Sequence, residues 1–175
     1  MKSSDTSPTR HVQMEALICQ VQDDEAHVRE HARVQLIDIG IRAVPAVSVL
    51  AKSSRVHVRW ECAKILAAIA DPDSVPVLVR LLEDSDAGVR WDAAEGLIAI
   101  GQPSVTPVLR AIIHRSLAFT IIAAAHHVMH ELAKQKWGEF LKPVYEALER
   151  QEPAISGPTA AAEALNDWEY KSLAG

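Results

Sequence analysis

Apolar residues recur along the chain at a nearly constant interval. Val28, Val58 and Val89 mark the period, and an arginine follows each of them. At matching distances after each valine come a leucine, an isoleucine and then a small residue. The leucines are Leu36, Leu66 and Leu97, the isoleucines Ile39, Ile69 and Ile100, and the small residues Gly40, Ala70 and Gly101. A fixed period of about 30 residues indicates a repeat architecture.

Each repeat is predicted to contain two helices. Val89, Ala93 and Leu97 form one stripe of a long helix that ends at Gly101. A proline opens the shorter second helix, because proline in the first helical turn loses no needed hydrogen bond. These prolines are Pro45, Pro76 and Pro107, and two of the short helices are expected over residues 76–83 and 107–114.

A polar residue stands four positions before the first apolar residue of each long helix. Such residues can accept a hydrogen bond from an unpaired helical N–H, so they are predicted to cap the helices. The four residues are Asp24, Ser54, Ser85 and Ser116. Extending the register backwards predicts a first short helix over residues 16–22 and its long partner over residues 24–39.

The pattern weakens towards the C-terminus. In the fourth unit, Thr120, Ala124 and Val128 are predicted to take the places of the core stripe, and Ile121 replaces the arginine. A fifth pair is expected from a short helix over residues 143–150 and a long one containing residues 161–165, after an insertion near residues 134–138. An atypical last pair closes the apolar end of a repeat array.

The predicted fold class is therefore all-α, a right-handed α-solenoid of about five helix pairs. Residues 1–9 are expected to form a disordered tail, and residues 10–175 a single domain. The expected repeats cover residues 10–40, 41–70, 71–101, 102–136 and 137–173.

The segment DPDSVPVLVRLLEDSDAGVRWDAAEGLIAIG, residues 71–101, resembles a HEAT-like repeat of the short type found in phycobilin lyase subunits. The resemblance is clearest over residues 24–115. It implies an α-solenoid whose long helices line a concave surface that holds proteins. It does not imply an enzyme, since fold and activity are separable. A phycobilin lyase role stays open on the resemblance alone.

Composition narrows the possible partners. Aromatic residues make up only 5% of the 175 residues, so small aliphatic side chains build the core. The net charge of −5 provides no overall attraction for phosphate, and we expect no nucleic-acid partner.

No apolar stretch has transmembrane length and residues 1–10 lack a signal-peptide pattern, so we expect a cytoplasmic protein without a membrane contact. Cys19 and Cys62 lie in apolar helical patterns and are expected to be buried, reduced thiols.

Three arginines, Arg29, Arg59 and Arg90, occupy equivalent positions in successive repeats. They could form a phosphate-binding stripe. Acidic residues in the neighbouring turns favour a structural ladder instead, in which each guanidinium binds a carboxylate or a carbonyl of an adjacent turn.

Trp60 and Trp91 lie two residues after the repeated valine, off the core stripe, and Ile122 is predicted to continue their row. Tryptophans among carboxylates are typical of interface anchors and would favour a basic partner. Sideways packing against the adjacent repeat is the alternative. The predicted partner-binding residues are Trp60, Glu61, Lys64, Trp91, Asp92, Glu95, Ile122 and His126.

Histidines cluster in the fourth long helix. His126 and His130 are four residues apart on one face, a spacing that can begin a metal site. The resemblance also raises deoxyhypusine hydroxylase, a HEAT-like di-iron enzyme with repeated His-Glu dyads. In this sequence only His130 and Glu131 form such a pair in that helix, and only His114 is a plausible further donor. We therefore predict no metal and no cofactor.

No Gly-rich phosphate loop, CxxC pair or GxSxG motif occurs in the sequence. The prediction is a non-enzymatic scaffold or adaptor that binds a protein on the concave face of its long helices. The alternative is a lyase-like or metal-dependent HEAT-repeat enzyme, or a subunit of one.

Overall fold

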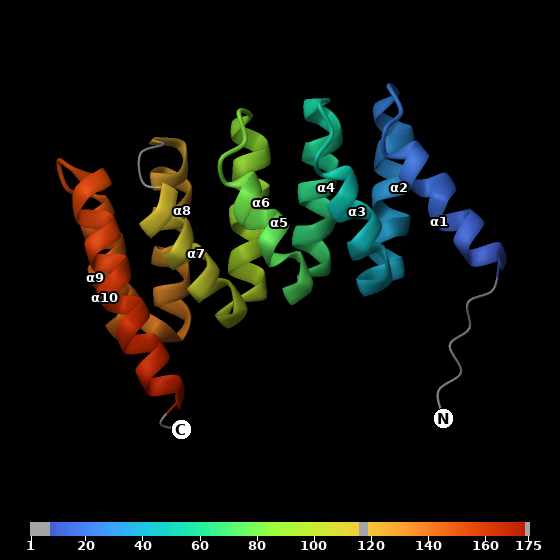
Figure 1. Ribbon diagram of the computed structural model, residues 1–175. Coiled ribbons are helices and arrows are strands. Elements are labelled where there is room, and N and C mark those ends of the chain that lie inside the picture. The colour runs from blue at the N-terminus through green and yellow to red at the C-terminus, as the bar shows by residue number, and fades with distance from the viewer. Residues whose placement is uncertain (1–7, 116–118, 174–175) are drawn as a thin grey trace.

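The computed structural model describes residues 8–115 and 119–173, and all the regular structure in them is helical. Within these residues, ten α-helices are arranged as a row of pairs, with α1 and α10 at opposite ends of the array (Figure 1). The helices are α1 (Pro8–Gln20), α2 (Ala26–Ile39), α3 (Val44–Leu50), α4 (Val56–Ile69), α5 (Val75–Leu81), α6 (Ala87–Ile100), α7 (Gln102–Arg115), α8 (Phe119–Leu132), α9 (Gly138–Leu148) and α10 (Pro153–Leu173). The predicted all-α solenoid is confirmed.

The first four helix pairs form two layers. Helices α2, α4, α6 and α8 pack directly on one another, and we call them the long-helix layer. Helices α1, α3, α5 and α7 form the second layer, and each packs against the long helix that follows it in the chain. Leu36, Leu66 and Leu97 are fully buried in α2, α4 and α6, so the period predicted from the sequence is the period of the core.

The long helices end as the sequence predicts. Gly40, Ala70 and Gly101 follow α2, α4 and α6 with φ angles of 70°, 52° and 78°. Glycine adopts positive φ without strain, and a small residue there lets the chain turn back at once.

The helix starts differ from the prediction by one residue. The N-cap positions of α2, α4 and α6 are Glu25, Arg55 and Asp86. Of these three, Asp86 alone caps with its side chain, accepting from the Val89 N–H at 3.0 Å. Asp24, Ser54 and Ser85 lie one residue further out, and Ser116 lies outside the described residues.

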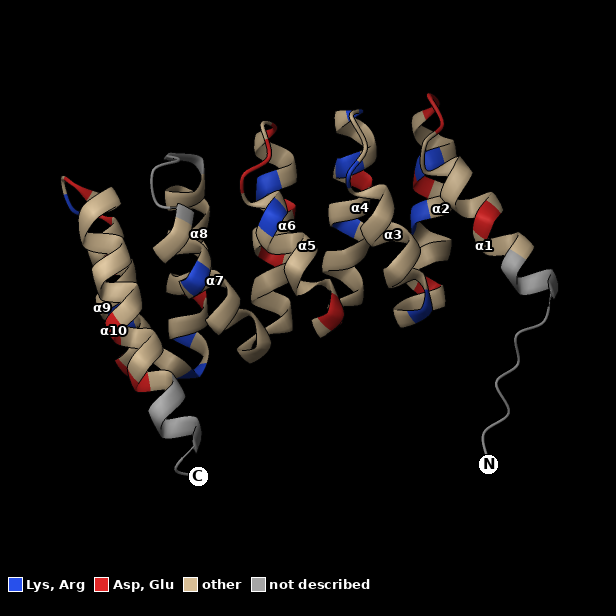
Figure 2. Ribbon diagram, in the orientation of Figure 1, with Lys and Arg blue, Asp and Glu red and all other residues tan. Residues whose placement is uncertain are grey.

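The arginine column holds the connections that precede the long helices. Nη1 of Arg59 donates to the carbonyls of Ser53 and Ser54, both at 3.0 Å. Arg29 and Arg90 make the same pair of bonds, and Figure 2 shows basic segments near the start of α4 and α6, with an acidic connection before α6. Arg59 also binds both carboxylate oxygens of Asp84, at 2.6 and 2.8 Å. The predicted structural ladder is confirmed.

The prediction that a proline opens each short helix is confirmed in two repeats and is wrong in the next. Pro45 and Pro76 lie in the first turns of α3 and α5, as predicted. Pro107 lies inside α7, which begins well before it, at Gln102. A 3₁₀ turn (Pro72–Ser74) precedes α5, whereas the fourth unit continues as one helix through that position.

The first helix also begins earlier than predicted. Helix α1 starts at Pro8, so Pro8 and Thr9 are helical although the sequence assigned them to a tail. Residues 1–7 of that predicted tail lie outside the described residues. Cys62 is buried as predicted, but the prediction that Cys19 is buried was wrong, since Cys19 lies on an exposed side of the first helix of the array.

The fourth repeat is shifted by one residue from the predicted register. Ile121, Ala125 and Met129 are buried at 1%, 0% and 0% exposure, and they take the places that the core stripe from Val89 to Leu97 has in α6. The predicted stripe was therefore one residue out of register, and Ile121 belongs to the core. One extra residue between α6 and α8 accounts for the shift.

In the last pair the order of the two layers is reversed: the first helix of the pair joins the long-helix layer, and the second joins the other layer. A π-helical turn (Ala133–Trp137) joins α8 directly to α9, and α9 packs beside α8 while α10 packs beside α7. The turn lies where the insertion was predicted. The expectation that residues 143–150 belong to the short-helix layer was wrong, because this tight turn keeps α9 in contact with the helix before it.

Candidate protein-binding surface

The eight predicted partner-binding residues all lie on the long-helix layer, but their environments differ. Trp60, Glu61 and Lys64 come from α4, Trp91, Asp92 and Glu95 from α6, and Ile122 and His126 from α8. Helix periodicity brings each set to a similar side of its helix, since residues three and four apart are neighbours. Contacts between helices then decide which of them reach solvent.

Glu61 is buried, at 3% exposure, which corrects its predicted place on an acidic surface. Its Oε2 accepts from Nη1 of Arg33 at 2.6 Å, and its Oε1 lies 3.7 Å from Nε of Arg29. Both arginines belong to α2, so Glu61 joins α2 to α4. The two guanidiniums compensate the buried charge of Glu61, so removing either partner would leave an unpaired buried charge.

Ile122 is also buried, at 8% exposure, and does not continue the tryptophan row. In the corrected register, Ile122 matches Arg90, and Ala123 matches Trp91. The row on the long-helix layer is therefore Trp60, Trp91 and Ala123. Ile121 and Ile122 are both buried, so their burial does not distinguish the registers; the starts of α6 at Ala87 and α8 at Phe119 do.

Trp60 is 37% exposed and is covered from several sides. The Nζ of Lys64 lies 3.3 Å from the centroid of its ring, a cation–π contact. A Cβ added to Gly88 on α6 would lie 3.2 Å from Nε1 of Trp60, so glycine permits this close packing. The indole therefore bridges α4 and α6.

Asp92 lies under this contact. Burial raises the pKa of its carboxyl, and the charge of Lys64 and a hydrogen bond from Trp60 offset only part of the rise. Its Oδ2 is buried without a hydrogen-bond partner among the described residues. Asp92 is therefore a poorly solvated carboxylate that supports Trp60.

Trp91 is 58% exposed, more open than Trp60. It stacks on His127 of α8, with ring centroids 4.7 Å apart and planes 19° apart. Nε2 of His127 lies 2.8 Å from Oε1 of Glu95, one turn after Trp91. His127, which the predicted set omits, thus connects two of its members.

A hollow of about 280 Å³ opens beside Trp91, between α6 and α8. Four alanines line it together with two rings and one guanidinium, and we call it the alanine hollow. Its residues are Ala87, Arg90, Trp91, Ala94, Ala123, Ala124 and His127. Aligning the repeats in the correct register would have shown Ala123 at the position where the preceding repeat has Trp91.

His126 faces the last helix pair. Its Nε2 lies 2.8 Å from Oε1 of Glu149, and its ring stacks on His130 at a centroid distance of 5.9 Å. The ring of Tyr145 on α9 meets His130 edge-on at 5.0 Å. These contacts tie α8 to α9, and the described residues contain no group of three or more His, Cys, Asp or Glu placed to hold a metal ion.

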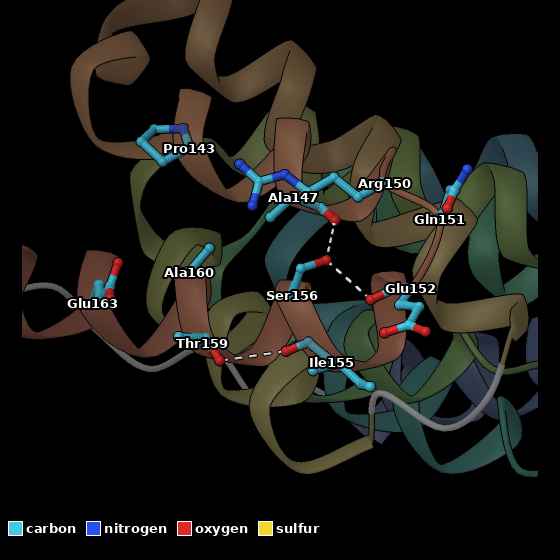
Figure 3. A pocket seen from close by; sticks show the side chains of 10 residues that line it. All are labelled: Pro143, Ala147, Arg150, Gln151, Glu152, Ile155, Ser156, Thr159, Ala160 and Glu163. Atoms are coloured by element: carbon cyan, nitrogen blue, oxygen red, sulfur yellow. Dashed lines mark hydrogen bonds between the residues drawn. The ribbon is translucent and has the colours of Figure 1, made fainter.

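A second cavity of about 580 Å³ lies between α9 and α10 (Figure 3). The hydroxyl of Ser156 donates to the carbonyls of Ala147 and Glu152, at 2.7 and 3.0 Å. The hydroxyl of Thr159 donates to the carbonyl of Ile155 at 3.3 Å. The Ser156 hydroxyl thus joins α10 to the end of α9, and the Thr159 hydroxyl bonds within α10.

Comparison with known protein families supports the repeat assignment. A family model described as HEAT repeats matches residues 43–130, half of the chain. The chain belongs to the HEAT-repeat family. The resemblance stated from residues 71–101 is confirmed.

Among solved structures, this HEAT-repeat protein is similar to a chain of the complex of CpcE and CpcF of phycocyanin lyase from Nostoc sp. PCC7120. The two are 21% identical over 88% of this chain and 98% of that chain, with a TM-score of 0.59, a likeness of fold. An engineered protein aligns at 18% identity over 87% of this chain and 77% of that chain, with a TM-score of 0.44. No curated protein matches the sequence. None of the described helices is both long enough and apolar enough to cross a membrane.

Proposed function

We propose that this HEAT-repeat protein is a non-enzymatic adaptor or scaffold that binds a protein partner on the exposed side of its long-helix layer. The observation that carries the proposal is Trp91, more than half exposed beside a hollow with an alanine floor. Exposed aromatic rings next to pockets are typical binding hot spots. Trp60 and Lys64 extend the surface onto α4, and Glu95 and His126 extend it along α6 and α8.

The charges nearby favour a basic partner surface. Glu95 and Glu149 have side chains that are 46% and 61% exposed, and the protein as a whole carries a net charge of −5. Complementary charge speeds encounter and fixes orientation more than it adds affinity. The arginines Arg29, Arg59 and Arg90 hold backbone carbonyls, so they do not favour a nucleic-acid partner.

The alternative function, a lyase-like subunit or a metal-dependent enzyme, has weaker support. The likeness to the phycocyanin lyase complex is one of fold. That complex contains two different subunits, CpcE and CpcF, which also agrees with a fold used for binding proteins. The thiol of Cys62 does not favour chemistry, because burial raises its pKa to about 12.

The proposal is tested by affinity capture from cells that naturally make the protein, with mass spectrometry of what is retained. The double variant Trp60→Ala, Trp91→Ala should lose its specific partners by at least tenfold, since an exposed tryptophan anchor such as Trp91 contributes about 2 kcal/mol. Val49→Ala, on an exposed residue of α3, is the control and should capture as the unmodified protein does. Equal capture by the double variant would assign both indoles to the framework.

Metal analysis of the purified protein tests the alternative. Stoichiometric iron or zinc that disappears on changing His126 and His130 would favour the enzyme. Circular dichroism of each variant separates a lost contact from a lost fold.

A further inference from the structure

We infer that the alanine hollow is a socket for one large apolar side chain of a partner segment that carries a lysine or arginine beside it. The inference deepens the proposed function and rests on it. Its support is the difference between two neighbouring interfaces of the long-helix layer, α4 with α6 and α6 with α8.

The hollow exists because the α6–α8 interface has small side chains where the α4–α6 interface has large ones. When the two interfaces are aligned in the corrected register, Ala87 replaces Val56, Ala123 replaces Trp91, and Ala124 replaces Asp92. Each replacement removes side-chain volume from the outer half of the interface. The core below it stays intact, since Ile121 and Ala125 are fully packed.

The walls of the hollow are held in place before any partner arrives. Trp91 stacks on His127, and His127 is bonded to Glu95 at 2.8 Å, so the two rings and the carboxylate restrain one another. A site whose side chains are already ordered loses little conformational entropy on binding. An aliphatic or aromatic side chain that enters the hollow would cover its alanine floor and gain contact with the Trp91 ring.

The charge beside the hollow selects a cation. In the repeat before, Lys64 lies over Trp60, four residues along the helix. At the equivalent position in α6 the residue is Glu95, so this position supplies no cation to Trp91. An external lysine or arginine would meet both the indole and the half-exposed carboxylate of Glu95.

Arg90, the cation in the lining, does not oppose this assignment. Its Nη1 donates to the carbonyls of Asp84 and Ser85, at 2.7 and 3.1 Å. The carboxylate of Asp84 lies close enough for Arg90 to lower its pKa. The guanidinium charge is therefore used within the protein. Glu95 is bonded to His127 but is still half-exposed, so it provides the carboxylate of the rim.

The test uses a phage-displayed library of random 12-residue peptides, selected on the full-length protein. We expect enrichment of peptides with a large apolar residue next to Lys or Arg. The variant Ala123→Trp restores the missing member of the tryptophan row and fills the hollow, so a synthetic peptide from the selection should bind it at least 30-fold more weakly. Ala99→Trp, at an exposed alanine of α6 outside the hollow, is the matched control and should bind the peptide unchanged.

The variant Glu95→Lys tests the charge preference separately. Selection on this variant should favour Asp or Glu beside the apolar residue, and the basic peptide should lose about tenfold in affinity. Absence of an enriched motif, or equal binding to Ala123→Trp, would overturn the socket. If the Trp60 and Trp91 double variant still lost its captured partners, the proposed function would stand without the socket.

A second copy of this chain is the competing occupant. Sedimentation velocity distinguishes it, since an oligomer of the unmodified protein that Ala123→Trp dissociates would place another copy in the hollow and overturn the peptide assignment. We expect both proteins to sediment identically. Equal helicity of the two variants by circular dichroism shows that the comparison is between folded proteins.

Discussion

Trp60 and Trp91 occupy the same position in adjacent repeats, yet they have different surroundings. Trp60 lies between Lys64 and the glycine at position 88 and is 37% exposed, whereas Trp91 is 58% exposed beside a hollow. The α4–α6 interface therefore uses its tryptophan to close a gap, and the α6–α8 interface leaves its tryptophan available. A repeat position fixes where a side chain lies, and the neighbouring helix decides what that side chain does.

The largest effect on this comparison should come from Gly96, where α6 lies close against α4. A Cβ there would lie 3.0 Å from Cα of Ala67 and 3.0 Å from Cδ1 of Leu78, and the backbone atom cannot move without shifting α4. Gly96→Val should lower the free energy of unfolding by about 3 kcal/mol. Urea unfolding followed by circular dichroism measures it, with Ala99→Val as the exposed control on α6. A change within the error of the control would show that the two helices do not pack this closely.

Two carboxylates of the α4–α6 interface should respond to pH in opposite directions. Burial alone would raise the pKa of Asp84, but hydrogen bonds from Arg59 and the backbone of Asp86, with the charges of Arg59 and Arg90, bring it below the usual value. A lowered pKa in the folded state gives stability that is present above the usual pKa of aspartate, about 4, and is lost as pH falls through the folded value. Asp84→Asn should therefore cost about 2 kcal/mol at pH 7 and less at pH 3.

Asp92 provides the opposite case. Burial raises its pKa, so its ionised form opposes folding, and stability is lost as pH rises from the usual value through the folded one. Asp92→Asn should leave stability at pH 7 unchanged or slightly higher. Urea unfolding of both variants from pH 3 to pH 7 measures the difference, and parallel pH curves for the two would contradict the assigned environments.

Truncating each tryptophan separates framework from surface. Trp60→Ala should lower the free energy of unfolding by about 2 kcal/mol, because the ring bridges two helices. Trp91→Ala should cost less than about 1 kcal/mol, since its ring is mostly exposed. Thermal and urea unfolding of the two single variants measure this order. A reversed order would assign the framework role to Trp91 and weaken the proposed surface.

The smallest effect is expected from the cation over Trp60. Lys64→Met with Trp60→Leu forms a double-mutant cycle whose coupling energy should be about 0.5 kcal/mol. The equivalent cycle of Glu95→Gln with Trp91→Leu should show no attractive coupling. An attractive energy in the second cycle would indicate that Trp91 is already satisfied within the protein.

The sequence predicted the repeat well where the period is strict. Leu36, Leu66 and Leu97 are buried in successive layers, and Gly40 and Gly101 end their helices, because burial and positive φ restrict those positions to few residue types. In the fourth unit, apolar residues at both 121 and 122 made two registers possible. The start of α8 at Phe119, which only the structure shows, distinguishes them.

The candidate surface was less predictable than the fold. Periodicity gives the side of a helix on which Glu61 lies, but its burial depends on Arg33, which is 28 residues away in the sequence. The hollow depends on Ala123 facing α6 across an interface. His127 entered the site because its ring meets Trp91, a contact between two helices that spacing along one helix does not reveal.

The sequence by itself determined that this protein is an array of helix pairs with an aliphatic core, since the side-chain pattern of each helix repeats with the period of the structure. Tertiary structure alone decided which of two equivalent tryptophans is open and which carboxylate is buried. It also decided that the two helices of the last pair exchange layers, because a π-helical turn and not a loop joins α8 to α9. The physical reason is that exposure depends on the side chains that face a residue from the next helix, and one inserted residue changes all of them.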